Sequence, residues 1–143
     1  VIVNGANADA LTVATSSGDI KLDSVSSKDT RISANSGDVS LGDVVMDNID
    51  LKTSSGNITS GSIKAKRING RASSGDVMIR DCDASEINVV TTSGDVSIGI
   101  GSEMKYEYNT KTSSGDVNVP DSVEGADGKC NIETSSGDID VTQ

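Results

Sequence analysis

Six aspartates, each one residue after a glycine and at nearly constant spacing, are the first candidates for chemistry. They are Asp19, Asp38, Asp76, Asp95, Asp116 and Asp138, and Asn57 takes the equivalent place in one further repeat. If the repeats stack, these carboxylates form a column with neighbours about 4.8 Å apart, which calcium could neutralise. Calcium needs about six to eight oxygen ligands, and calcium-binding β-roll repeats are shorter nonapeptides. We therefore expect these side chains to cap turn amides, with a calcium column as the minor alternative.

A local concentration of basic residues is the second candidate. It consists of Lys52, Lys64, Lys66, Arg67 and Arg71, and the repeat spacing makes Lys52 and Arg71 neighbours in one outward column. Such a patch could contact an anionic glycan or a lipid headgroup. A solvated face whose charges protect a sheet edge is the simpler interpretation.

The inventory for catalysis and cofactor binding is poor. The chain has no His, Trp or Phe and only two Tyr, so it has no Ser-His or Cys-His pair, and no phosphate-binding loop occurs. Any two neighbouring aspartates could form an acid pair, but six equivalent copies indicate a structural role. We predict no enzyme, no catalytic residue and no cofactor.

Charge and hydropathy narrow the classes of partner. Twelve basic residues against 22 acidic ones give a formal charge of −10, which repels phosphate backbones, so nucleic acid is excluded as a partner. No apolar stretch approaches the roughly 20 residues needed to cross a bilayer, so we expect no membrane insertion by this segment.

A repeat of Ser-Gly followed by Asp or Asn positions all of these residues. Its glycines follow at spacings of 19, 19, 19, 19, 21 and 22 residues: Gly18, Gly37, Gly56, Gly75, Gly94, Gly115 and Gly137. In the turn, glycine is expected to take a positive φ, which a β-branched residue would resist. The motif is therefore interpreted as a structural corner.

Apolar residues alternate with polar ones on both sides of each glycine. The second residue after it is always Val or Ile, and the fifth and seventh residues before it are mostly apolar as well. This period of two predicts two strands with one buried face. A weaker third side is marked seven residues after the glycine by Val25, Val44, Ile63 and Cys82.

A unit of 19 residues cannot bury its own apolar face, whereas stacked parallel copies can. We therefore predict an all-β, single-stranded parallel β-helix (β-solenoid) of about seven to eight coils, one domain over residues 1–143, with the right-handed form favoured. The pattern is cut within a coil at both ends, which indicates a fragment of a longer chain. The longer spacings place irregular loops at residues 99–103 and 120–129.

Three smaller sets of residues are assigned structural roles. Asn69, Asn88, Asn109 and Asn131 form an outward column and are expected to stack consecutively as an amide ladder. Tyr106 and Tyr108 are interpreted as core at the end of the rod. The apolar columns hold Cys82 and Cys130, which sequential stacking places two to three coils apart, so both are predicted to be buried free thiols.

The repeats resemble a known family. TSSGDIKL at residues 15–22 and ASSGDVMI at residues 72–79 are similar to the bacterial adhesin-type domain family of unknown function, with its SSGD-type β-helical repeats. The resemblance covers essentially the whole chain. It implies a β-helical ectodomain, extracellular or at the cell surface, attached to a membrane protein or exported, and it implies no catalytic residues.

The leading hypothesis is accordingly a non-enzymatic bacterial cell-surface module, an adhesin or an envelope scaffold, with a protein or a glycan as its surface partner. Anchoring would come from segments outside residues 1–143. One alternative is a polysaccharide-binding or polysaccharide-degrading β-helix, by analogy of fold alone. The other is a calcium-stabilised repeat domain. Bare ends of the coil stack also make edge-to-edge self-association an expected behaviour.

Overall fold

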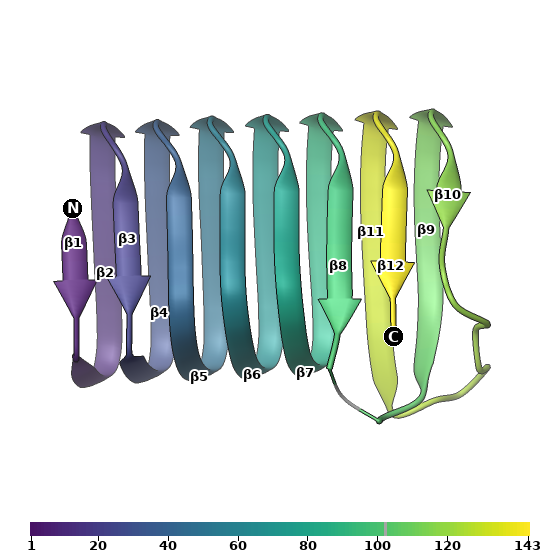
Figure 1. The fold of residues 1–143 in the computed structure, drawn as a ribbon, viewed down its shortest axis with the longest axis horizontal. Helices are drawn as coiled ribbons and strands as arrows, with labels where there is room; N and C mark the ends of the chain where they lie inside the picture. Colours follow the sequence, from purple (N-terminus) through teal and green to yellow (C-terminus); the bar gives the residue numbers. More distant parts are fainter. Residues whose placement is uncertain (102) are drawn as a thin grey trace.

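The computed structural model describes residues 1–101 and 103–143, and its regular elements are all β-strands (Figure 1). Ser102, which belongs to the loop expected at residues 99–103, lies outside the described residues. The strands are β1 (Ile2–Asn4), β2 (Asn7–Ser17), β3 (Ile20–Asp23), β4 (Val25–Ser36), β5 (Val39–Ser55), β6 (Ile58–Ser74), β7 (Val77–Ser93), β8 (Val96–Ile100), β9 (Tyr106–Ser114), β10 (Val117–Asn118), β11 (Gly128–Ser136) and β12 (Ile139–Thr142).

The strands form a flattened β-solenoid with two faces (Figure 1). The front face consists of β1, β3, the N-terminal halves of β5, β6 and β7, then β8, β12 and β10; the back face consists of β2, β4, the C-terminal halves of β5 to β7, then β11 and β9. All pairing is parallel, and most registers advance by one 19-residue repeat, as in Val39 to Ile58 to Val77. The predicted fold class is confirmed, with about seven coils.

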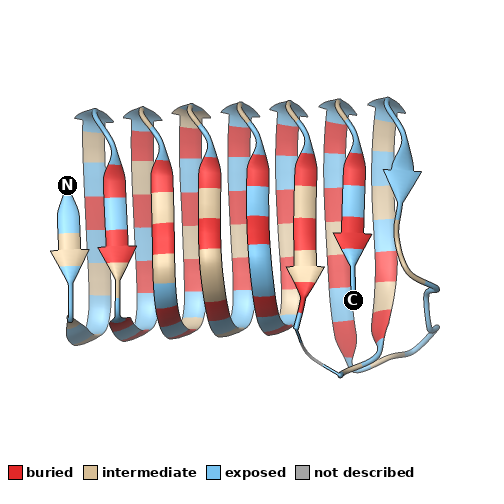
Figure 2. Cartoon of the chain, in the orientation of Figure 1, coloured by how far each residue is buried: buried red, intermediate tan, exposed pale blue. Residues whose placement is uncertain are grey.

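The core is a set of stacked aliphatic columns between the two faces (Figure 2). Ile20, Val39, Ile58 and Val77 follow one another along the front face, and each is buried. The weaker third side is buried too, because Val25, Val44, Ile63 and Cys82 close the bottom of the coils. Tyr106 and Tyr108 are buried at the C-terminal end of the stack, as expected.

Each repeat turns at its glycine, and two physical constraints require that residue. All seven corner glycines have φ between 110° and 145°, a region that side chains with a Cβ rarely adopt. In addition, a Cβ on Gly75 would collide with the carbonyl oxygen of Gly56 in the preceding coil. The corner therefore needs glycine both for its backbone conformation and for the close approach of successive coils.

The order of the coils in space differs from their order in the chain. On the front face β12 lies between β8 and β10, and on the back face β11 pairs with both β7 and β9. The last coil is thus inserted between its two predecessors (Figure 1). The expectation of sequential stacking is wrong at this point. The extra residues of the two longer repeats form the connections into and out of the outermost coil, from β8 to β9 and from β10 to β11.

Contacts specific to the last two coils favour the insertion. The register places Lys129 between Glu86 and Glu107, whereas sequential stacking would place the two glutamates side by side. The Tyr106 hydroxyl donates a 2.6 Å hydrogen bond to the carbonyl of Ala84 in β7. Its ring passes over Gly128 of the inserted coil, where a Cβ would meet ring carbon Cδ1 at 2.6 Å. Because Gly128 has no Cβ, the Tyr106 side chain can pass over it and reach the carbonyl of Ala84.

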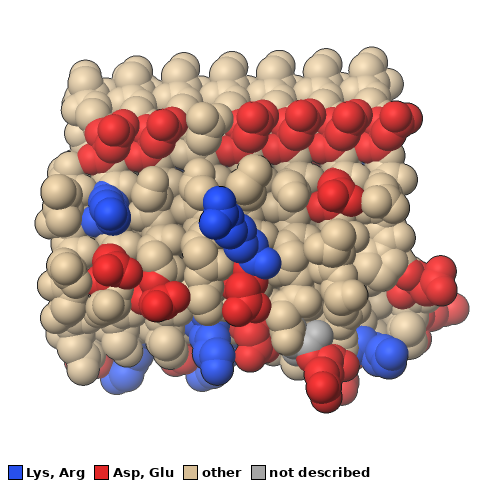
Figure 3. All heavy atoms as spheres, viewed as in Figure 1, with Lys and Arg blue, Asp and Glu red and all other residues tan. Residues whose placement is uncertain are grey.

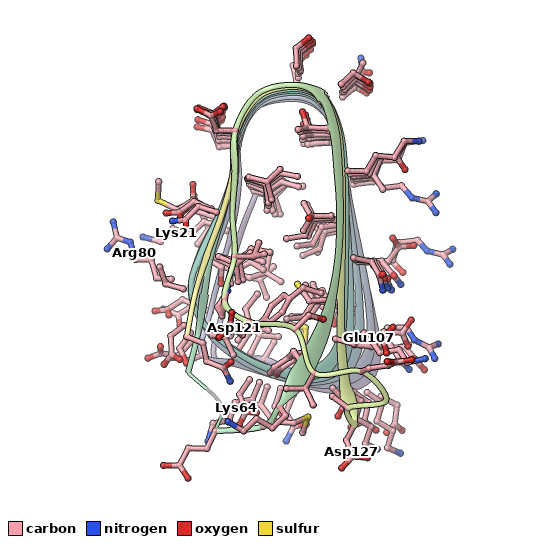
Figure 4. All side chains as sticks on the ribbon, turned by 90° about the vertical axis from the view of Figure 1, so that its right-hand side faces the viewer. Lys21, Lys64, Arg80, Glu107, Asp121 and Asp127 are labelled. Atoms are coloured by element: carbon pink, nitrogen blue, oxygen red, sulfur yellow. The ribbon has the colours of Figure 1, made fainter. Side chains whose placement is uncertain are left out.

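The loop after β10 covers part of the edge of β9 at the C-terminal end (Figure 4). The backbone N–H of Val123 donates to the carbonyl of Tyr106 at 2.9 Å, and the N–H of Tyr108 donates to Ser122 Oγ at 2.9 Å. An uncovered strand edge is a template for pairing with another chain. The loop reduces that exposure along the first residues of β9.

The insertion also corrects the predicted separation of the two cysteines. Cys130 pairs in register with Ile87 of β7, the strand that contains Cys82, so the two thiols lie one coil apart rather than two or three. Both are buried and free, as expected.

Candidate functional site

The aspartate column forms an acidic ridge, defined as Asp19, Asp38, Asp76, Asp95, Asp138 and Asp116 in spatial order. Figure 3 shows it as a row along the front face, with one interruption where Asn57 takes its place. In every ridge residue except Asp116, the last in the row, Oδ1 accepts a hydrogen bond of 2.7–3.0 Å from the backbone N–H of the equivalent residue in the next coil. Asn57 Oδ1 accepts the same bond at 2.9 Å. The carboxylates therefore cap the neighbouring turn, not their own.

This geometry bears on the calcium alternative. One oxygen of each carboxylate up to Asp138 is already engaged by a backbone amide. In the described part of the chain, no three His, Cys, Asp or Glu side chains converge to hold a metal ion. The ridge as it stands links coils to one another.

The basic residues are divided between the back face and the bottom of the coils. Lys66 forms an ion pair with Asp47 at 3.2 Å, and Arg67 forms one with Glu86 at 3.0 Å. Lys64 lies at the bottom of the coil (Figure 4). Lys52 and Arg71 are register neighbours on the back face, as the spacing predicted. The five residues therefore do not form one patch, and only the Lys52 and Arg71 pair remains as a local concentration of positive charge.

The four asparagines form a continuous amide ladder on the back face, in the spatial order Asn69, Asn88, Asn131 and Asn109. Asn88 Nδ2 donates to Asn69 Oδ1 at 3.1 Å, Asn131 Nδ2 to Asn88 Oδ1 at 2.8 Å, and Asn109 Nδ2 to Asn131 Oδ1 at 3.1 Å. The sequence predicted the stack, and the structure corrects its order.

A shallow groove of about 490 Å³ runs beside the amide ladder. The ladder forms one wall, and the next outward column, which contains Val90, Glu133 and Lys111, forms the other. Val90 is 43% exposed, and Lys111 is ion-paired with Glu133 at 3.1 Å. The groove thus combines amide groups, one apolar contact surface and a neutralised charge pair.

Glu86 connects the amide ladder to the neighbouring column of charges. Its Oε1 accepts a 2.9 Å hydrogen bond from Asn88 Nδ2, and its Oε2 accepts one of 3.0 Å from Arg67 Nε. These two hydrogen bonds lower the pKa of the Glu86 carboxyl group below its usual value, and the bond from Asn88 has the larger effect. Glu86 therefore fixes the orientation of the Asn88 amide, both of whose N–H groups are now used.

The buried thiols are unsuited to nucleophilic chemistry. Burial raises the pKa of Cys82 and of Cys130 to about 12, so both remain protonated at neutral pH. They act as small apolar core residues.

Several features of this groove were not found from the sequence. Val90, Glu133 and Lys111 share an outward column that the repeat spacing defines, but the insertion of the last coil decides that Glu133 follows Val90. The only available signal was the pair of longer spacings before Gly115 and Gly137. Those spacings indicate loops, but they do not show where the loops lead.

In the comparison with protein families, a family model described as Toastrack DUF4097 matches residues 2–143. Searches of curated proteins and of solved structures find no match. Within the residues that the structure describes, no helix has the length and apolar character needed to span a membrane.

Proposed function

The chain belongs to the Toastrack DUF4097 family, whose function is unknown, and on that premise we propose that it is a non-enzymatic interaction module of the bacterial cell surface. It serves as an adhesin or an envelope scaffold and holds an extended partner, a protein or a glycan, along its back face. The amide ladder with its adjacent groove is the observation that carries this proposal.

The ladder suits recognition because its amide groups are held in place before any partner arrives. Each asparagine is fixed by the next one along the stack, and Asn88 is additionally fixed by Glu86. A site whose side chains are already ordered loses less conformational entropy on binding. The second N–H of Asn131 and that of Asn109 have no acceptor among the described residues, so each can donate a hydrogen bond to a bound partner.

The groove also suits a linear partner. Side-chain columns in a solenoid recur about every 4.8 Å along its axis, so a polymer lying parallel to the axis meets similar groups in successive coils. Val90 offers an apolar surface at the β7 end of the groove. The four coils that carry the amide ladder therefore present a straight, repeated set of contacts.

Binding of the purified chain to immobilised cell-wall polymers, host glycans and matrix proteins tests this proposal. The informative variant is Asn131→Ala combined with Asn109→Ala, which removes half of the ladder on the exposed face. Its matched control is Ser40→Ala combined with Thr59→Ala, which changes the same number of polar side chains on the front face. We expect the ladder variant to lose binding and the control to retain it.

Two results would overturn the proposal. One is the absence of binding to every member of the panel, and the other is equal binding by the ladder variant and the wild-type chain. The location is tested separately by protease treatment of intact cells that express the protein. A surface module should be digested from outside, whereas a protected signal would contradict the proposed location.

A further inference from the structure

Lys52 and Arg71 are neighbouring cations of the back face, and neither forms an ion pair in the described part of the chain. Lys129 of β11 forms none either, but it lies in register between Glu86 and Glu107. Lys28, Arg31, Lys66, Arg67 and Lys111 each form an ion pair, with N–O distances between 2.8 and 3.9 Å. Lys52 and Arg71 instead lie directly opposite each other on adjacent strands, and both are exposed. The fold therefore keeps two like charges together.

Like charges opposite each other on neighbouring strands reduce sheet stability. An anion bound between them would reverse this effect, because each cation would then have an opposite charge within hydrogen-bonding range. The two side chains leave from strands about 4.8 Å apart, a separation that a single carboxylate can bridge. Arg71 offers a planar pair of donors, which matches the two oxygens of a carboxylate.

A third donor lies beside this pair. Asn69 is two residues before Arg71 on β6, so both side chains leave the same face of the strand about 7 Å apart. Asn69 Oδ1 accepts the hydrogen bond from Asn88, whereas its Nδ2 donates no hydrogen bond within the described residues. Asn69 thus adds a donor without an acceptor among the described residues to the face of β6 that carries Arg71, and its register neighbour on β5 is Asp50.

We infer that the back face binds a linear acidic polysaccharide, with a carboxylate group of the glycan at Lys52, Arg71 and Asn69 and the following sugar units along the amide ladder. This inference rests on the proposed function and specifies its partner. The hydroxyl groups of a glycan can pair with the free N–H groups of Asn131 and Asn109, and the apolar face of a sugar ring can contact Val90.

Two other classes of polymer fit less well. An extended peptide binds a sheet by adding to its edge, but in the coils of β5, β6 and β7 the backbone is already paired on both sides. Nucleic-acid binding depends on neutralising many phosphates, whereas the described part of this face has few cations outside ion pairs and the chain carries a net charge of −10. A glycan that needs only one of its carboxylates paired at this site makes the smallest demand for positive charge.

Isothermal titration with oligogalacturonate, oligomannuronate and hyaluronan fragments, each compared with its methyl-esterified form, tests the inference. Esterification removes the charge and keeps the sugar backbone. We expect at least one acidic oligosaccharide to bind about tenfold or more tightly than its ester, with weaker binding at higher salt. Lys52→Gln combined with Arg71→Gln should reduce its affinity to that of the ester.

The matched control is Lys21→Gln combined with Arg80→Gln, which removes one lysine and one arginine from the front face (Figure 4). It should bind like the wild-type chain. Equal affinity for acidic and esterified forms, or equal loss in both double variants, would overturn the inference. If no acidic glycan binds but a neutral glycan or a protein still binds the ladder, the acidic-glycan inference fails and the proposed function stands. If nothing binds, the inference and the proposed function both fail.

Discussion

Asn131 Nδ2 donates a 2.8 Å hydrogen bond to Oδ1 of Asn88, a residue 43 positions earlier in the chain. A neighbouring coil would normally be one repeat away. The bond exists because the last coil occupies the place between β7 and β9. The coil of β9 and β10, at the end of the stack, therefore comes earlier in the chain than the coil of β11 and β12, which lies inside it. The amide ladder depends on this order.

Engineered disulfides can test the order of the coils. Ser136 pairs in register with both Ser93 and Ser114, so Ser93 and Ser114 are separated by a whole coil. Adjacent strands place Cα atoms about 4.8 Å apart, within disulfide range, and two coils place them about 9.6 Å apart, beyond it. We expect mild oxidation to link the Ser93→Cys and Ser136→Cys pair, and mass spectrometry of the linked peptides should detect this.

The pair Ser93→Cys and Ser114→Cys is the matched control for that experiment. Sequential stacking would bring these two positions together, whereas the observed order separates them. Efficient linkage in this control with none in the first pair would show that the coils follow chain order. The native thiols do not interfere, because Cys82 and Cys130 are buried.

Glycine substitutions separate the two kinds of glycine in the repeat. Gly75 has φ of 140°, and a Cβ there would collide with the carbonyl of Gly56. Gly70 lies in a core column, where a Cβ would meet only Val89 Cγ2 at 3.7 Å, an ordinary contact. We expect Gly75→Ala to lower the free energy of unfolding by about 2 kcal/mol or more. Gly70→Ala should leave it unchanged or raise it by up to about 1 kcal/mol.

Urea unfolding of both variants measures these differences. Equal destabilisation by the two substitutions would show that the corner has no special requirement for glycine. A stable Gly75→Ala variant would contradict the close approach of successive corners.

The sequence contains most of the fold and only part of the candidate site. Ile58 and Val77 could be assigned to one inward column from spacing alone, because burial in a solenoid depends on position within the repeat. The same periodicity cannot fix the order of coils, since every coil presents nearly the same columns to its neighbours. That order depends on residues outside the repeat, such as Tyr106 with its link to Ala84. The groove shares this dependence, because Glu133 reaches Val90 only through the insertion.

Ser60 occupies a core position between Leu41 and Ile79 in the front-face column. It is fully buried, and its hydroxyl has no hydrogen-bond partner among the described residues. A buried hydroxyl without a partner costs about 1–3 kcal/mol, so Ser60→Ala should raise the free energy of unfolding by about 1 kcal/mol. Ser62→Ala, at a half-buried outward position of the same strand, should change it little. A loss of stability in Ser60→Ala, seen by thermal unfolding, would indicate that the hydroxyl has a partner.

Alkaline pH should destabilise the protein through its buried thiols. Burial raises the pKa of Cys82 and Cys130 from 9.0 to about 12. Above pH 9 the unfolded chain loses these protons while the folded chain retains them, so the folded state binds more protons. The contribution to stability is therefore complete below pH 9 and is lost as the pH rises from 9 toward 12. Tyr108, whose pKa burial raises from 10.0 to about 12, acts in the same direction above pH 10.

The free energy of unfolding, measured by urea titration from pH 7 to pH 11, checks this dependence. Cys82→Ala combined with Cys130→Ala should be less stable at pH 7, because it removes core volume, but its decline above pH 9 should be shallower than that of the wild-type chain. A thiol reagent at pH 8 should modify neither cysteine in the folded chain and both in urea. Parallel pH profiles for the variant and the wild-type chain would assign the alkaline loss to other groups, and rapid modification of the folded chain would contradict the burial of the thiols.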